Sequence, residues 1–159
     1  MLFGNQERLA EGDGFMKEIL NQVNHLIQVH ETRNPFRIAA QEKIYIELED
    51  YDMIKGFYIN AFDKKFIYIN RNLDEISRLI VCAHELGHAI LHDANETAFL
   101  KEHTLFPVHS KTEREANYFA AVLILDDELD EDSYYKDGRQ LDAKIFKKLI
   151  EIKNMYNYN

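Results

Sequence analysis

The spacing of apolar and polar residues predicts a helix near each end of the chain and three short strands between them. Apolar side chains recur at helical spacing from about Phe15 to His30, and again over residues 140–156. Between residues 43 and 70, short apolar runs, one of them alternating with polar residues, are typical of strands. The predicted strands are Lys43–Glu49, Gly56–Ala61 and Lys65–Asn70.

The last two predicted strands are joined by Phe62-Asp63-Lys64, and a connection of this length indicates a hairpin. We therefore expect a small antiparallel sheet. Residues 1–14 contain three of the six glycines and are expected to be irregular. Residues 93–110 are expected to form a connection with a short helical piece at Glu96–Lys101.

A third helix is predicted directly after the sheet, because apolar residues recur at i, i+4, i+7 and i+11. These residues are Leu79, Ala83, Leu86 and Ile90. Asp74 and Ser77 precede them and can cap the start of the helix. Gly87 in the interior of this helix costs roughly 1 kcal/mol relative to alanine. Close approach of another backbone, or of a substrate, would explain that cost.

A fourth helix is predicted over Thr112–Leu125. It is apolar nearly all round after Ala116, which indicates a buried helix. With 159 residues, of which 46% are hydrophobic, the chain is long enough for one globular core. The patterns together predict a single α+β domain over residues 1–159, in which a small antiparallel sheet packs with the third helix and further helices.

The charge balance limits the classes of partner. The chain has 19 basic and 28 acidic residues, a net charge of −9, and no cluster of Lys or Arg. Such a chain is a poor match for nucleic acid, which is bound through basic patches, and for an anionic membrane surface. The acidic run at 126–132 is predicted to be solvated surface.

The single cysteine, Cys82, excludes an intramolecular disulfide, and its apolar neighbours predict a buried thiol rather than a redox group. The first residues lack the basic start and apolar core of a signal peptide. No apolar run approaches the roughly 18 residues of a membrane span. We therefore expect a cytoplasmic protein.

The third helix carries His84-Glu85-Leu86-Gly87-His88, which has the HExxH arrangement of a zinc protease. Residues four apart lie on one face of a helix, so His84 and His88 can direct both imidazoles at one ion. Glu85 lies beside them and can accept a proton from a water that the ion activates. The alternative is an amphipathic core helix with two half-exposed histidines.

A catalytic zinc ion needs a third protein ligand. His92 lies on the same helix, but roughly 12 Å along its axis from His84, and therefore cannot share an ion whose bonds are about 2 Å long. The fourth helix opens with Glu113 and Glu115, and each could instead belong to a capping box. The residues alone leave the choice between Glu113 and Glu115 open.

Two segments resemble the ImmA/IrrE family of metallo-endopeptidases, in order and at the family's spacing within residues 65–125. They are His84-Glu85-Leu86-Gly87-His88 with Leu91-His92, and Glu113-Arg114-Glu115-Ala116-Asn117-Tyr118-Phe119-Ala120-Ala121. The resemblance implies a zincin-like fold, a bound Zn²⁺ ion and a third ligand at Glu115, the glutamate directly before Ala-Asn. Downstream, Leu123-Ile124-Leu125-Asp126-Asp127 replaces the family's usual Leu-Leu-Met-Pro-like segment.

The resemblance further implies an endopeptidase of a phage or mobile element that cleaves a small helix-turn-helix repressor and so relieves repression. The alternatives are a metal-bound module that binds a repressor or toxin without turnover, a DNA-binding regulator, and a hydrolase of non-peptide amides. Glu85 counts against the first, because binding needs no general base, and the acidic charge counts against the second. An oxyanion-stabilising residue is left unassigned among Tyr68, His92, His109 and Tyr118.

Overall fold

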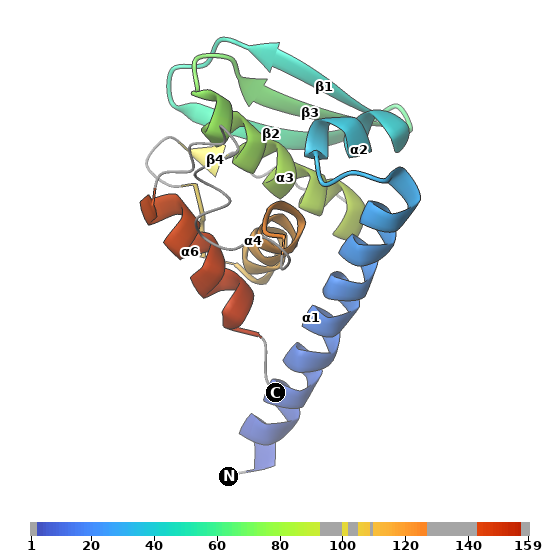
Figure 1. The fold of residues 1–159 in the computed structure, drawn as a ribbon, viewed down its shortest axis with the longest axis vertical. Coiled ribbons are helices and arrows are strands. Elements are labelled where there is room, and N and C mark those ends of the chain that lie inside the picture. The colour runs from blue at the N-terminus through green and yellow to red at the C-terminus, as the bar shows by residue number, and fades with distance from the viewer. Residues whose placement is uncertain (1–2, 93–99, 102–104, 109, 127–142, 157–159) are drawn as a thin grey trace.

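The fold is a small sheet that lies across one side of a helical layer (Figure 1). A computed structural model describes residues 3–92, 100–101, 105–108, 110–126 and 143–156. The helices are α1 (Phe3–His30), α2 (Pro35–Gln41), α3 (Glu75–Leu91), α4 (Lys111–Ile124) and α6 (Ala143–Asn154). The strands are β1 (Ile44–Glu49), β2 (Ile54–Ala61), β3 (Lys64–Asn70) and β4 (Leu100–Lys101). The predicted α+β class is confirmed.

The predicted hairpin is present and joins β2 to β3. The two strands are antiparallel, and Ala61 pairs with Lys64 across a two-residue turn. Both turn residues, Phe62 and Asp63, have positive φ angles, 55° and 58°. Positive φ at both positions gives the turn the twist that matches the flanking strands.

The prediction of a wholly antiparallel sheet is wrong for β1, which pairs in parallel with β3. The strand order is β1-β3-β2-β4, so β3 lies between β1 and β2. β2 runs in the direction opposite to β1, and β3 reverses direction again after the hairpin turn. β3 therefore runs in the same direction as β1, with which it pairs. Apolar alternation in β1 specifies which face of the strand is buried, but it does not specify the strand with which β1 pairs.

The starts of two helices were not predicted. α1 begins at Phe3, whereas residues 1–14 were expected to be irregular. Each glycine in a helix costs about 1 kcal/mol, but extending an existing helix adds a hydrogen bond for every residue. α2 was not predicted from the sequence, and Pro35 lies in its first turn, where Asn34 Oδ1 accepts the backbone N–H of Phe36 at 2.9 Å. Proline at this position lacks only an N–H that would be unpaired anyway.

The connection after α3 contains a short strand where a helical piece was predicted. Leu100 and Lys101 form β4, which pairs with β2 at Gly56 and Ile54. The rest of that predicted piece, the acidic run beyond Asp126 and the candidate His109 lie outside the described residues.

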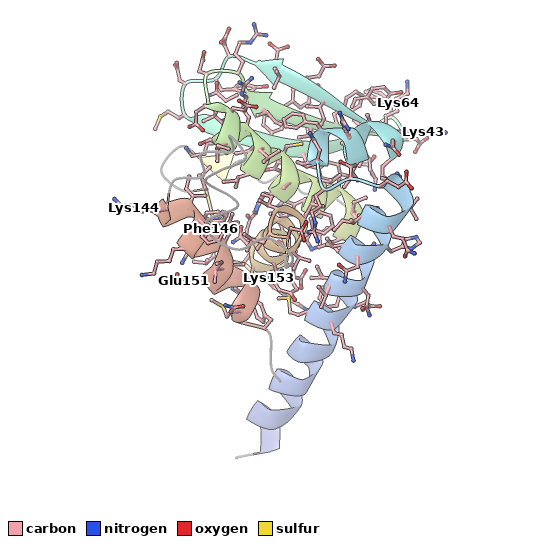
Figure 2. All side chains as sticks on the ribbon, in the orientation of Figure 1. Lys43, Lys64, Lys144, Phe146, Glu151 and Lys153 are labelled. Atoms are coloured by element: carbon pink, nitrogen blue, oxygen red, sulfur yellow. The ribbon has the colours of Figure 1, made fainter. Side chains whose placement is uncertain are left out.

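The core forms where α3 lies between the sheet and α4 (Figure 1). Every side chain of α3 from Ile80 to Ala89 is buried, and Ile67 and Ile69 of β3 are fully buried. The predicted C-terminal amphipathic helix is present as α6: Figure 2 shows Phe146 pointing toward the body and Lys144 pointing away. Within the described part of the chain, no helix is long and apolar enough to cross a membrane.

The close approach predicted at Gly87 occurs against α4. A Cβ atom at Gly87 would lie 3.2 Å from Ala116 Cα and 3.2 Å from the Phe119 side chain. We expect Gly87→Ala to lower the free energy of unfolding by about 1 kcal/mol, because overpacking of roughly 1–3 kcal/mol outweighs the gain in helix propensity. Thermal or urea unfolding measures this.

Gly14 of α1 provides the matched control, since a Cβ atom there would meet nothing within 4 Å. Gly14→Ala should therefore stabilise the protein by up to about 1 kcal/mol. Equal stabilisation by both substitutions would contradict the close packing of α3 on α4.

Candidate metal centre

The two histidines of the HExxH segment lie side by side on α3. Asp74 caps the start of this helix as predicted, with Oδ1 accepting the Ser77 N–H at 2.8 Å. His84 is 1% exposed and His88 is 9% exposed, and their Nε2 atoms are 3.1 Å apart. The predicted pairing of the two imidazoles on one helical face is therefore present.

The carboxylate that joins this pair is that of Glu113. Its Oε2 lies 3.0 Å from His84 Nε2, and its Oε1 lies 3.4 Å from His88 Nε2. Three ligands bound tetrahedrally with bonds of about 2.0–2.1 Å would be about 3.4 Å apart. Among the described residues, His84, His88 and Glu113 are the group whose side-chain atoms could share one metal ion.

The start of α4 places Glu113 against α3. Ser110 caps α4, and its Oγ accepts the Glu113 N–H at 3.2 Å. This hydrogen bond is one half of the predicted capping box. The other half would use the Glu113 carboxylate, which is directed to the histidines instead. Ala116, one turn further along, is the residue that Gly87 contacts, so Glu113 and Ala116 share the face of α4 that packs on α3.

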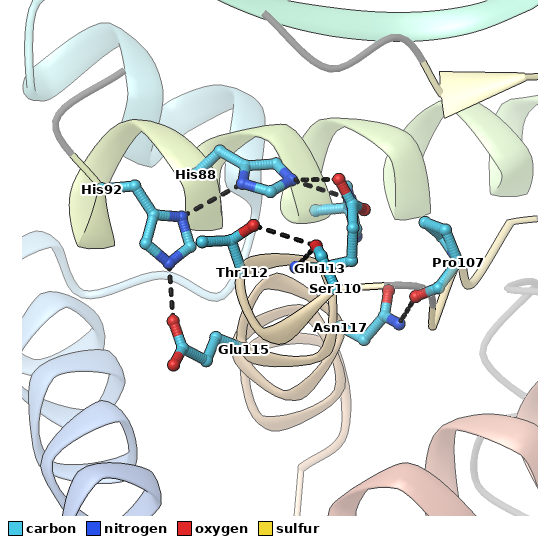
Figure 3. A network of polar contacts seen from close by, with 9 residues as sticks. His88, His92, Pro107, Ser110, Thr112, Glu113, Glu115 and Asn117 are labelled. Atoms are coloured by element: carbon cyan, nitrogen blue, oxygen red, sulfur yellow. Dashed lines mark hydrogen bonds and ion pairs between the residues drawn. The ribbon is translucent and has the colours of Figure 1, made fainter. Parts of the chain in front are cut away.

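The structure does not bring Glu115 to the imidazole pair. Glu115 lies two residues after Glu113, roughly 200° around the helix. Its Oε2 is 2.7 Å from His92 Nε2, and its Oε1 is 3.6 Å from Lys111 Nζ. Figure 3 shows the two glutamates on different sides of α4, each pointing to a different histidine. This geometry favours Glu113 as the third metal ligand, a choice that the sequence alone leaves open.

Glu85 is buried beside the cluster, at 1% exposure. Burial raises the pKa of its carboxyl group well above the ordinary value, and the negative charge of Glu113 adds to the effect. Glu85 Oε2 has no hydrogen-bond partner among the described residues. A buried carboxyl oxygen without a partner is costly, and such oxygens are retained where a ligand or substrate uses them.

The protonation states favoured at Glu113 and His88 suit a bound cation. Burial acts to raise the pKa of Glu113, but the neighbouring imidazoles of His84 and His88 outweigh it and hold that pKa far below its usual value. Burial lowers the pKa of His88 and favours its neutral form. An ionised carboxylate and neutral imidazoles are the protonation states that bind divalent metals. The donor set of two nitrogens and one oxygen fits zinc.

The remaining candidates from the sequence lie away from the cluster. Tyr118 is buried with its ring 5.3 Å from that of Tyr156. Tyr68 stacks on Phe57 at 4.9 Å, and side-chain alternation places it on the opposite face of the sheet from the buried Ile67 and Ile69. Cys82 is fully buried, as predicted, and burial raises the pKa of its thiol.

Asn117 is a buried polar residue of α4 that the sequence reasoning did not single out. Its Nδ2 donates to the Pro107 carbonyl at 2.6 Å (Figure 3), which ties the segment before α4 to the helix. Asn117 lies four residues after Glu113, on the same face. That spacing was the signal that could have identified it.

Comparisons with known proteins identify the family of the chain. Residues 30–152 match the peptidase M78 family model, described as the IrrE N-terminal-like domain. The chain is 45% identical over 106 residues to "uncharacterized immunity region protein 2" of Bacillus phage phi105, an alignment that covers 66% of each protein. It is 36% identical over 115 residues to metallopeptidase ImmA of Bacillus subtilis (strain 168), covering 71% of this chain and 66% of the relative.

No solved structure gives a significant match. The family model covers α2 to most of α6, and so includes both helices that carry the cluster. The resemblance drawn from the HExxH and Glu-x-Glu-Ala-Asn segments is confirmed. The chain therefore belongs to the IrrE N-terminal-like family of M78 peptidases.

Proposed function

We propose that the chain is a zinc-dependent endopeptidase in which His84, His88 and Glu113 hold the metal and Glu85 is the general base. The observation that carries the proposal is the convergence of three buried side chains from α3 and α4, whose nitrogen and oxygen atoms lie 3.0–3.4 Å apart. Family membership supports a metallopeptidase. The proposal takes Glu113 as third ligand in place of Glu115, because Glu113 is the glutamate beside both imidazoles.

In the proposed reaction, His84, His88 and Glu113 would hold a zinc ion, which would supply a Lewis acid that polarises the peptide carbonyl and lowers the pKa of a water molecule toward neutrality. Glu85 would accept a proton from that water through its unpartnered Oε2 while the water oxygen bonds to the carbonyl carbon. It would then return the proton to the amine nitrogen as the C–N bond breaks. A metal ion held by these residues would favour the ionised form of Glu85 through its positive charge, which would offset the effect of burial on the Glu85 pKa. The buried surroundings strengthen these electrostatic interactions.

We propose that the substrate is a small DNA-binding repressor with a helix-turn-helix fold, encoded by a phage or mobile element, and that cleavage occurs in the cytoplasm. The relative from phage phi105 carries an immunity-region name, which supports a phage setting. The net charge of −9 supports a protein substrate rather than direct binding of nucleic acid.

The test is incubation of the purified, zinc-loaded chain with a candidate helix-turn-helix repressor of phage origin, with and without a chelator. We expect two fragments of the repressor by mass spectrometry, and none when the chelator is present. A stable complex without fragments would reject the endopeptidase and favour the metal-bound binding module. Fragments that persist with the chelator would reject the role of the metal.

A further inference from the structure

A chain of polar contacts leads outward from the proposed metal ligand His88. His88 Nδ1, on the ring edge away from the cluster, lies 3.1 Å from His92 Nδ1. On its other side, His92 Nε2 lies 2.7 Å from Glu115 Oε2. Figure 3 shows the three side chains in a row, running from the end of α3 to the start of α4. The cluster of His84, His88 and Glu113 is complete without either of these contacts.

The contacts fix where the protons lie if both imidazoles are neutral. The Glu115 carboxylate can only accept, so His92 Nε2 must carry a proton and donate it. His92 Nδ1 is then the acceptor, and His88 Nδ1 must donate to it. That leaves His88 Nε2 with a free lone pair, and Nε2 is the atom that faces Glu113 and His84.

We propose that His92 and Glu115 are positioning residues that hold His88 in the orientation and tautomer that bind the metal. The inference rests on the proposed role of His88 as a ligand. A metal-bound histidine commonly donates its other ring N–H to a carboxylate or carbonyl, which fixes the ring and increases its basicity. Here a second imidazole extends that arrangement to a carboxylate on the neighbouring helix.

The position of His88 explains why this ligand needs support. His88 lies in the last turn of α3, and helix ends fray. His92 is the C-cap residue, and its backbone N–H also donates to the His88 carbonyl at 3.0 Å. His84 lies one turn deeper, at 1% exposure, and its Nδ1 has no partner among the described residues. Support is therefore supplied to the ligand nearer the helix end.

Substitution of His92 separates positioning from a purely structural contact. We expect His92→Phe to weaken zinc affinity by about 10–100-fold, the usual effect of losing such a partner. His92→Gln should remain within about threefold of the original protein, because the amide still offers one acceptor and one donor. His25→Phe, at an exposed site on α1, is the control and should leave zinc affinity unchanged.

Competition with a chromophoric zinc chelator measures these affinities. Unchanged affinity in His92→Phe, or an equal loss in both His92 variants, would overturn the positioning role. If the unaltered protein binds zinc and His84→Ala does not, the proposed metal site stands whatever the His92 variants show. If the unaltered protein bound no zinc, the proposed function itself would fail.

A second measurement needs no substitution and remains informative if His92→Phe does not fold. Nitrogen chemical shifts of the zinc-loaded, ¹⁵N-labelled protein report which ring nitrogens carry protons. We expect His92 to be protonated at Nε2 and not at Nδ1. The reverse tautomer, or protons on both nitrogens, would overturn the proposal.

Discussion

Replacing Glu113 with glutamine is expected to remove the metal and, with it, peptide cleavage. The amide keeps the size of the side chain but loses the negative charge that lies 3.0 Å from His84 Nε2. Only two imidazole ligands would remain, and zinc sites in enzymes use three protein ligands. We expect zinc affinity to fall by more than the roughly 100-fold that loss of an outer partner can cost.

Glu115→Gln is the matched control, because it makes the same chemical change two residues away. The amide oxygen at this position can still accept the His92 Nε2 proton, so we expect zinc affinity to fall by less than about tenfold. Zinc content after dialysis and chelator competition on both variants provide the measurement. Retention of metal by Glu113→Gln together with its loss from Glu115→Gln would restore Glu115 as the third ligand.

Replacing Glu85 with glutamine is expected to stop cleavage while the metal stays bound. An amide has almost the same shape as the carboxyl group, so the buried site should tolerate it. It cannot accept a proton from water at neutral pH, and loss of a general base commonly costs about 10²–10⁴-fold in rate. Single-turnover cleavage and zinc content, measured on the same preparation, test both halves of the expectation.

Glu75→Gln provides the comparison on the same helix. Glu75 is exposed in the first turn of α3, far along the helix from the histidines. We expect full cleavage and full zinc content, with at most a loss of about 0.3–1 kcal/mol from its interaction with the helix dipole. Normal cleavage by Glu85→Gln would remove Glu85 from the mechanism, and loss of zinc from it would make Glu85 a ligand or a structural residue.

The local parts of the site could be predicted from the sequence because they depend on helix geometry alone. The spacing of His84 and His88 sets their common face, and Asp74 marks where the helix begins. The cost of Gly87 correctly indicated a close neighbour, which is Ala116 of α4. The hairpin was predictable for the same reason, since a short turn brings consecutive strands together.

The third ligand could not be chosen from local pattern, because α4 is buried on all sides from Glu115 to Ile124 and its apolar residues mark no single face. A tertiary clue was available in the small residues. Gly87 requires a small partner, and Ala116 and Ala120 share a helical face with Glu113, whereas Glu115 lies about 100° from Ala116. The parallel pairing of β1 and the contact between His92 and Glu115 depend on how distant segments meet, which periodicity does not encode.

The three proposed ligands come from two helices that are separated in sequence, and this has a consequence for handling the protein. A bound ion would act as a cross-link between α3 and α4 that exists only in the folded state. A ligand at 100 times its dissociation constant adds about 2.7 kcal/mol to the free energy of unfolding. Preparations with partial metal content would therefore contain two populations of different thermal stability, and a melting curve would report the loading of the site before any substrate is known.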